Sequence, residues 1–174
     1  MELESLTIMA LGYTPQAGFE SYFARRASQD GKPFTELEDP IAVLRSIMTL
    51  PLPVQFDALA QTFEDLPKAP EIMQELLALW YAGDAEGLFD ATMDNMGTLE
   101  DAALLKETLF DKRNVTMTKA LLPLLESGKT TFAMVGAGHL GGREGMLSEL
   151  RRAGFSPVQL SNGGEPLEAV VTFP

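Results

Sequence analysis

The sequence lacks cysteine and contains a single histidine. Without cysteine, the chain has no disulfide framework, no thiolate nucleophile and no cysteine-based zinc site. A single histidine excludes a metal site built from several histidines of one chain, and it excludes a proton relay between two histidines. The compartment stays open between cytoplasm and periplasm, because a periplasmic protein can also lack cysteine.

Positive charge is scarce, with 13 lysines and arginines against 25 aspartates and glutamates, which gives a net charge of -12. Binding to nucleic-acid phosphates or to an anionic membrane surface requires basic clusters, so we expect neither partner. The acidity is uneven. Residues 1–110 hold 19 acidic and 6 basic residues, a net of -13, whereas residues 111–174 hold 6 and 7, a net of +1. We therefore expect an acidic, solvated helical surface over the first part of the chain.

Long hydrophobic runs are also absent. The apolar segment at residues 6–11 is too short to span a bilayer, and the first five residues lack the basic region of a signal peptide. A length of 174 residues, with 45% hydrophobic and 22% charged residues, is typical of one globular domain. We therefore expect one soluble domain over residues 1–174, without a membrane span.

Helical periodicity occupies most of the chain. Apolar residues recur at helical spacing in residues 19–27, and the pattern is nearly all helical over residues 40–126. Prolines and glycines interrupt this pattern at intervals and divide it into successive helices. The sequence therefore predicts an all-helical central segment.

The pattern changes after the helical region. Residues 130–135 (TTFAMV) are a β-prone apolar run, followed by a glycine-rich turn, a short helix and β-prone segments at residues 158–160 and 169–173. A strand, a helix and a strand in this order predict a parallel βαβ unit with a right-handed crossover. With a further short strand at residues 34–37 (FTEL), the sequence predicts a helix-rich α/β fold with a small mixed sheet.

The loop at residues 136–142 (GAGHLGG) follows the first of these predicted strands. Ligands of open α/β sheets bind beyond the carboxyl ends of the strands, and glycines let a backbone approach a ligand closely. Gly136 and Gly138 are therefore candidate substrate-binding residues. His139 is the candidate metal ligand or acid–base group. The alternative is a tight turn whose histidine caps a helix or bonds a carbonyl group.

The same loop matches the G-x-G-x-x-G pattern of dinucleotide-binding sites through Gly136, Gly138 and Gly141. Only one strand–helix–strand unit follows the helical segment, whereas dinucleotide-binding folds usually contain two halves. A lone glycine pattern is also a weak signal. We therefore expect no NAD binding.

Two further groups of polar residues can carry chemistry. Arg113 and Asn114 stand side by side at a helix start, where they can clamp a carboxylate or a phosphate. Glu36 and Glu38 lie on one face of the predicted short strand, next to Asp39, and clustered carboxylates can bind a metal ion or act as a base. For each group, the alternative is a solvated surface.

Several short motifs together resemble the TraB/GumN family, in the order in which that family carries them. The most specific are the loop at residues 136–142 and the Arg-Asn-x-x-Met stretch that begins at Arg113. The other matching stretches are Gly18-Phe19-Glu20, Gly31-Lys32-Pro33, Leu37-Glu38, Trp80-Tyr81-Ala82-Gly83-Asp84 and Gly154-Phe155. The resemblance covers nearly the whole chain.

The TraB/GumN family is similar to the Tiki metalloproteases and, more distantly, to erythromycin-esterase-like proteins. The resemblance therefore implies a metal-dependent hydrolase of a small molecule or a peptide. It implies His139, Arg113 and Glu38 as catalytic residues, with His139 and Glu38 as ligands of a divalent metal ion. Arg113 would stabilise an oxyanion or hold a substrate carboxylate, and Asn114 would contribute to substrate binding.

One departure from the family pattern affects the prediction of a metal-dependent hydrolase. The family has two GxxH motifs, and only the second falls on this chain, at Gly136 and His139. We expect a domain that is incomplete at its N-terminus, or a short divergent member, with an incomplete catalytic site. The alternative function is a non-catalytic binding or regulatory module that uses the glycine-rich loop.

The apolar segments at residues 8–11 and 131–135 predict a homodimer or a higher oligomer, because uncovered apolar surface favours pairing with another chain. The alternative is a monomer, which repulsion between copies of net charge -12 would favour.

Overall fold

The computed structural model describes residues 2–94, 96, 102–161 and 164. The α-helices of this part are α1 (Glu2–Ala10), α2 (Phe19–Gln29), α3 (Pro40–Met48), α4 (Leu52–Asp65), α5 (Ala69–Ala82), α6 (Ala85–Asp94), α7 (Ala102–Lys106), α8 (Lys112–Glu126) and α9 (Met146–Arg152). Short 3-10 turns are η1 (Pro15–Ala17), η2 (Leu66–Lys68) and η4 (Ala137–His139), and a π-helical turn, η3 (Glu107–Asp111), joins α7 to α8.

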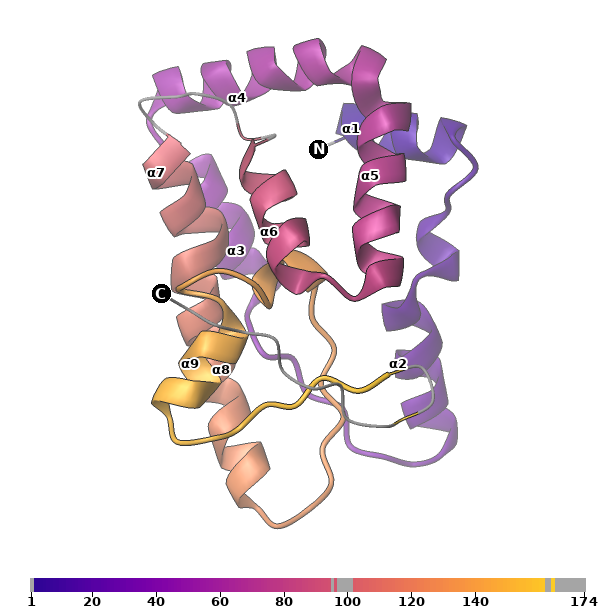
Figure 1. Cartoon of the computed structure of the whole chain (residues 1–174), viewed down its shortest axis with the longest axis vertical. Helices are drawn as coiled ribbons and strands as arrows, with labels where there is room; N and C mark the ends of the chain where they lie inside the picture. The colour runs from indigo at the N-terminus through magenta and orange to yellow at the C-terminus, as the bar shows by residue number, and fades with distance from the viewer. Residues whose placement is uncertain (1, 95, 97–101, 162–163, 165–174) are drawn as a thin grey trace.

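Figure 1 shows α7 and α8 as one column on one side of the molecule and α5 above α2 on the other. Helix α4 crosses between the two sides at one end, and α6 lies between the columns. Two long segments without helix, which precede α3 and follow α8, run through the middle of the view. The loop that contains His139 therefore lies between the column of α8 and α9 and the central helix α6.

Local sequence signals set the helix boundaries. The carboxylate of Asp39 accepts a hydrogen bond of 2.9 Å from the backbone N–H of Ile41, and Pro40 occupies the first turn of α3. These are the usual N-cap and N1 residues of a helix. Gly83 ends α5 with a φ of 71°, a left-handed conformation that favours glycine. The helix-rich chain and the helical central segment that the sequence predicts are therefore found in the described residues.

The described core contains two small clusters along the α7–α8 column, and Leu88 and Ala91 of α6 are buried as well. One contains Leu50, Val54 and Leu105, between the start of α4 and α7. The other contains Met117, Leu121 and Met146, where α8 meets α9. The second cluster anchors the loop at residues 136–142, because this loop leads directly into α9.

The predicted α/β fold with a mixed sheet and a parallel βαβ unit is wrong. The described residues contain no β-strand: residues 34–37, 130–135 and 158–159 have no regular secondary structure. The predicted strand at residues 169–173 lies outside the described residues. A β-prone run becomes a strand only when a neighbouring chain segment supplies ladder hydrogen bonds.

Some apolar side chains of these segments contact helices, whereas Phe34, Phe132 and Val158 remain more than half exposed. Val135 and Leu37 both lie against the cluster between α8 and α9, and the ring of Phe132 lies 4.7 Å from that of Phe23 in α2. The hydroxyl of Thr131 donates a hydrogen bond to the carbonyl oxygen of Leu124. None of the described helices combines the length and the apolarity needed to cross a bilayer.

Candidate functional site

The glycine-rich loop is a compact turn packed against α6. The backbone N–H of His139 donates to the carbonyl oxygen of Gly136 at 2.9 Å, which closes the turn η4. A Cβ at Gly141 would collide with the carbonyl oxygen of Ala85, so only glycine fits there. The backbone N–H of Gly142 donates to the carboxylate of Glu86 at 2.8 Å. The glycines thus allow the loop to pack closely against α6, and this packing fixes the position of His139.

Asn114 of α8 determines which nitrogen of His139 carries the proton. Its Nδ2 donates to the carbonyl oxygen of Glu144 at 2.8 Å, and a carbonyl oxygen can only accept. The Oδ1 of Asn114 therefore faces His139 as an acceptor, 2.7 Å from Nδ1. Nδ1 must then hold the proton, which leaves Nε2 with a free lone pair. A neutral imidazole held in this way can bind a metal ion or accept a proton through Nε2.

His139 is neutral at pH 7. Burial lowers the pKa of its imidazole to about 4, with a further contribution from the positive charge of Arg113 and an opposing one from Glu38. Only 8% of the residue is exposed, and the ring of Phe110 lies 5.1 Å away at a tilt of 40°. An apolar wall of this kind disfavours the charged imidazolium.

Arg113 and Glu38 form a bidentate ion pair that joins α8 to the segment before α3. The Nε of Arg113 donates to Glu38 Oε2 at 3.0 Å, and Nη2 donates to Oε1 at 2.6 Å. Nη1 donates to the carbonyl oxygen of Leu109 at 3.0 Å. The hydrogen bonds from Arg113 hold the pKa of the Glu38 carboxyl below its usual value. All three guanidinium nitrogens and both carboxylate oxygens are therefore engaged.

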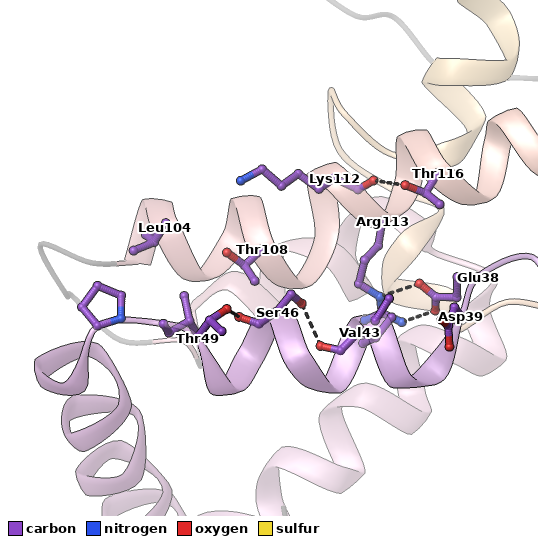
Figure 2. A pocket seen from close by; sticks show the side chains of 13 residues that line it. Glu38, Asp39, Val43, Ser46, Thr49, Leu104, Thr108, Lys112, Arg113 and Thr116 are labelled. Atoms are coloured by element: carbon purple, nitrogen blue, oxygen red, sulfur yellow. Dashed lines mark hydrogen bonds and ion pairs between the residues drawn. The ribbon is translucent and has the colours of Figure 1, made fainter.

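The ion pair lies at one end of a groove of about 380 Å³ between α3 and the α7–α8 column. Figure 2 shows Glu38, Asp39 and Arg113 gathered at this end, whereas Leu104 lies at the other. Between them, Ser46 of α3 faces Thr108 of the π-helical turn η3. The groove thus offers charged and hydroxyl groups at one end and apolar walls at the other.

The π-helical turn shapes both the groove and the surroundings of His139. It brings Thr108 to the groove and Phe110 to the imidazole within three residues. The Nζ of Lys106 lies 2.7 Å from both carboxylate oxygens of Asp111, a pair that bridges the extra residue of the turn. Such turns often occur at functional sites. No local pattern in residues 107–111 predicts this turn, because none of them interrupts the helical periodicity.

The described part of the chain shows no ready-made group of metal-ligating side chains. Within residues 2–94, 96, 102–161 and 164, no three His, Cys, Asp or Glu side chains gather at one point. Protein metal sites of the catalytic kind generally use three protein ligands. The carboxylate of Glu38 is also occupied by Arg113, and a guanidinium beside a metal site would oppose the charge of the ion.

The structure joins four of the residues that the sequence singled out in two bonded pairs, His139 with Asn114 and Arg113 with Glu38, and only the second pair lines the groove. Gly136 packs against the imidazole, since a Cβ there would lie 3.6 Å from His139 Cδ2, and Gly138 lies against Phe110 and Thr92. Asp39 instead caps α3. Sequence reasoning missed Phe110, although it precedes Arg113 by one helical turn.

No curated protein and no solved structure matches the chain. The model of one family, described as the TraB/PrgY/gumN family, matches residues 1–159.

Proposed function

The chain belongs to the TraB/PrgY/gumN family, and we propose that it is a domain of a hydrolase that acts on amide or ester bonds. In this proposal, His139 contributes one neutral imidazole nitrogen, Nε2, to the reaction site. The observation that carries the proposal is the hydrogen-bond chain from Glu144 through Asn114 to His139, which frees this nitrogen.

A buried imidazole with a fixed tautomer needs an explanation other than packing. The Nδ1–H of His139 needs a buried acceptor, whose loss would cost about 1–3 kcal/mol, and an apolar side chain would fill the same space without that requirement. Site residues are commonly held in this way, with one ring nitrogen bonded to the protein and the other left for the reaction. The arrangement of His139 supports such a role.

In this proposal, the charges of Arg113 and Glu38 influence the pKa of His139, and both side chains help to position the substrate. Arg113 helps to keep the imidazole neutral, and Glu38 opposes it. Both side chains also line the end of the groove where a substrate's polar group would lie. The substrate, a small molecule or a peptide, would place its apolar part toward Leu104.

A catalytic metal site generally uses three protein ligands. The described residues bring no three His, Cys, Asp or Glu side chains together. We therefore expect no robust peptidase or esterase turnover from the 174-residue chain when Zn²⁺, Mn²⁺ or Co²⁺ is added. The measurement is the initial rate on a panel of chromogenic esters and fluorogenic peptides, with His139→Ala as the comparison. Turnover that His139→Ala abolishes would contradict the expected incompleteness of the site.

The role of His139 itself is tested by nuclear magnetic resonance. Because the chain has one histidine, a tag-free sample gives a single imidazole spectrum. We expect a protonated Nδ1, a bare Nε2 and a shift of the Nε2 signal when Zn²⁺ is added at millimolar concentration. A protonated Nε2, or an imidazole signal that responds to neither metal ions nor ester and peptide analogues, would refute the proposal.

A second candidate function is a binding or regulatory module without catalysis. It is favoured by the internal pairing of Arg113, Glu38 and Asn114, whose hydrogen-bonding groups are largely used within the chain. In that case a ligand would shift the signals of the groove residues Ser46 and Thr108 and leave the imidazole of His139 unchanged. In the hydrolase case, the same titration shifts both.

A further inference from the structure

Helix α4 (Leu52–Asp65) is apolar on two opposite faces. One face carries Val54, which is 1% exposed, and Ala58, and it packs into the cluster with Leu50 and Leu105. The opposite face, called here the outer face of α4, consists of Leu52 (66% exposed), Phe56 (66%), Leu59 (47%) and Phe63 (55%). A helix that is apolar on opposite sides is normally covered on both of them.

The outer face has the spacing of a coiled-coil seam. Its four residues are separated by four, three and four positions, which corresponds to d, a, d and a of a heptad with Phe56 and Phe63 at the a positions. Val54 then occupies an f position, on the far side of the helix from the seam. The pattern is therefore typical of a helix that packs along its length against another helix.

The residues that flank the seam indicate what kind of partner helix packs against α4. The flanking e and g positions hold Pro53, Gln55, Ala60 and Thr62, none of which is charged. The acidic residues of α4, Asp57, Glu64 and Asp65, lie at b and c positions, farther from the seam. A basic partner helix would be recognised by acidic e and g positions. A second copy of this acidic chain would be repelled by them, so uncharged flanks fit a second copy.

We propose that α4 pairs with α4 of a second copy in an antiparallel, two-fold arrangement. In this register, Leu52 faces the partner's Phe63, and Phe56 faces the partner's Leu59. Each of the four layers then pairs a leucine with a phenylalanine. The outer face of α4 is therefore complementary to itself, as a two-fold interface requires. This surface differs from the segments at residues 8–11 and 131–135 that the sequence suggested for assembly.

The size of the outer face sets the expected affinity. Four half-exposed Leu and Phe side chains supply on the order of 400–500 Å² per chain, which places the interface at the low end of specific ones. We therefore expect a reversible dimer with a dissociation constant in the range of about 1–100 µM. This inference does not depend on the proposed hydrolytic function.

Sedimentation velocity and light scattering of the tag-free chain from about 1 to about 200 µM, a range that brackets the expected dissociation constant, test the dimer. Phe56→Glu is expected to weaken association at least about 100-fold, because it places like charges in a desolvated seam. Phe34→Glu is the control, since Phe34 is equally exposed (65%) and lies outside α4. Circular dichroism checks that both variants keep their helix content. A monomer at every concentration, or a dimer that Phe56→Glu leaves intact, would overturn the proposal.

The absence of cysteine makes the register testable. Phe56→Cys and Leu59→Cys are prepared separately and oxidised with oxidised glutathione, alone and as a mixture. In the proposed register, the mixture forms the disulfide-linked dimer faster than either variant alone. Faster cross-linking of Phe56→Cys with itself would indicate a parallel pair and contradict the antiparallel register.

Discussion

The Oδ1 of Asn114 lies 2.7 Å from the Nδ1 of His139, and this contact determines the chemical state of the only histidine in the chain. Asn114 is fully buried, and its amide group is held by the carbonyl oxygen of Glu144, which precedes α9. One side chain thus links α8, the glycine-rich loop and the start of α9. Position, tautomer and neutrality of the imidazole follow from packing between elements that are distant in the sequence.

Replacing Asn114 by alanine is expected to destabilise the protein by about 2–4 kcal/mol, because the change leaves the Nδ1–H of His139 and the carbonyl of Glu144 unpaired in a buried place. The measurement is the free energy of unfolding in urea. Thr116→Ala is the matched control, since Thr116 lies on the same helix but is exposed and bonds only the carbonyl of Lys112. Equal losses in the two variants would contradict the role assigned to Asn114.

The pH dependence of stability is expected to carry a contribution from His139. Its pKa is lowered from the ordinary 6.5 to about 4 by burial and by Arg113. Above pH 6.5 the imidazole is neutral in both states. As the pH falls from 6.5 toward 4, the unfolded chain takes up the proton and the folded chain does not, so stability is lost over this range.

Between pH 7 and pH 5 this contribution amounts to about 1–2 kcal/mol, discounted for the partial access of solvent. His139→Gln keeps an amide in place of the imidazole and removes the titrating group. The expected result is a smaller loss of unfolding free energy in His139→Gln than in the unchanged chain over the same pH range. Identical pH profiles would show that the pKa of His139 is not lowered in the folded protein.

The ion pair of Arg113 and Glu38 is expected to depend on the shape of the guanidinium. Arg113→Lys keeps the charge but loses the bidentate contact to Glu38 and the bond to the carbonyl of Leu109, at a cost of about 1–2 kcal/mol. A double-mutant cycle with Glu38→Gln measures the coupling. The exposed pair of Lys112 and Glu107 serves as a comparison, with an expected coupling below about 1 kcal/mol. Equal couplings for both pairs would oppose this expectation.

We expect no binding of NAD in a calorimetric titration. The pattern of Gly136, Gly138 and Gly141 resembles a dinucleotide fingerprint, but in the structure the space beside Gly141 and Gly142 is filled by α6. The strand that should precede such a loop is also absent from the described residues. Affinity in the micromolar range would overturn this prediction.

Sequence reasoning predicted the helices well because their signals are local. Asp39 and Pro40 begin α3, and Gly83 ends α5, each through contacts within a few residues. The same reasoning failed for the sheet. A run such as residues 130–135 has the composition of a buried strand, but pairing depends on a partner segment elsewhere in the chain. In the structure, Val135 packs against the cluster between α8 and α9, and Phe132 is largely exposed.

The sequence by itself determined the helix-rich architecture, the acidity of the chain and the importance of a glycine-rich loop with the sole histidine. It also marked Arg113, Asn114 and Glu38 as candidate site residues, which the family resemblance placed with His139 in one site. Only the tertiary structure decided that Asn114 bonds His139 and that Arg113 pairs with Glu38, 75 positions away. Packing likewise decided that the second apolar face of α4 is exposed, because burial depends on neighbours that periodicity along one helix cannot identify.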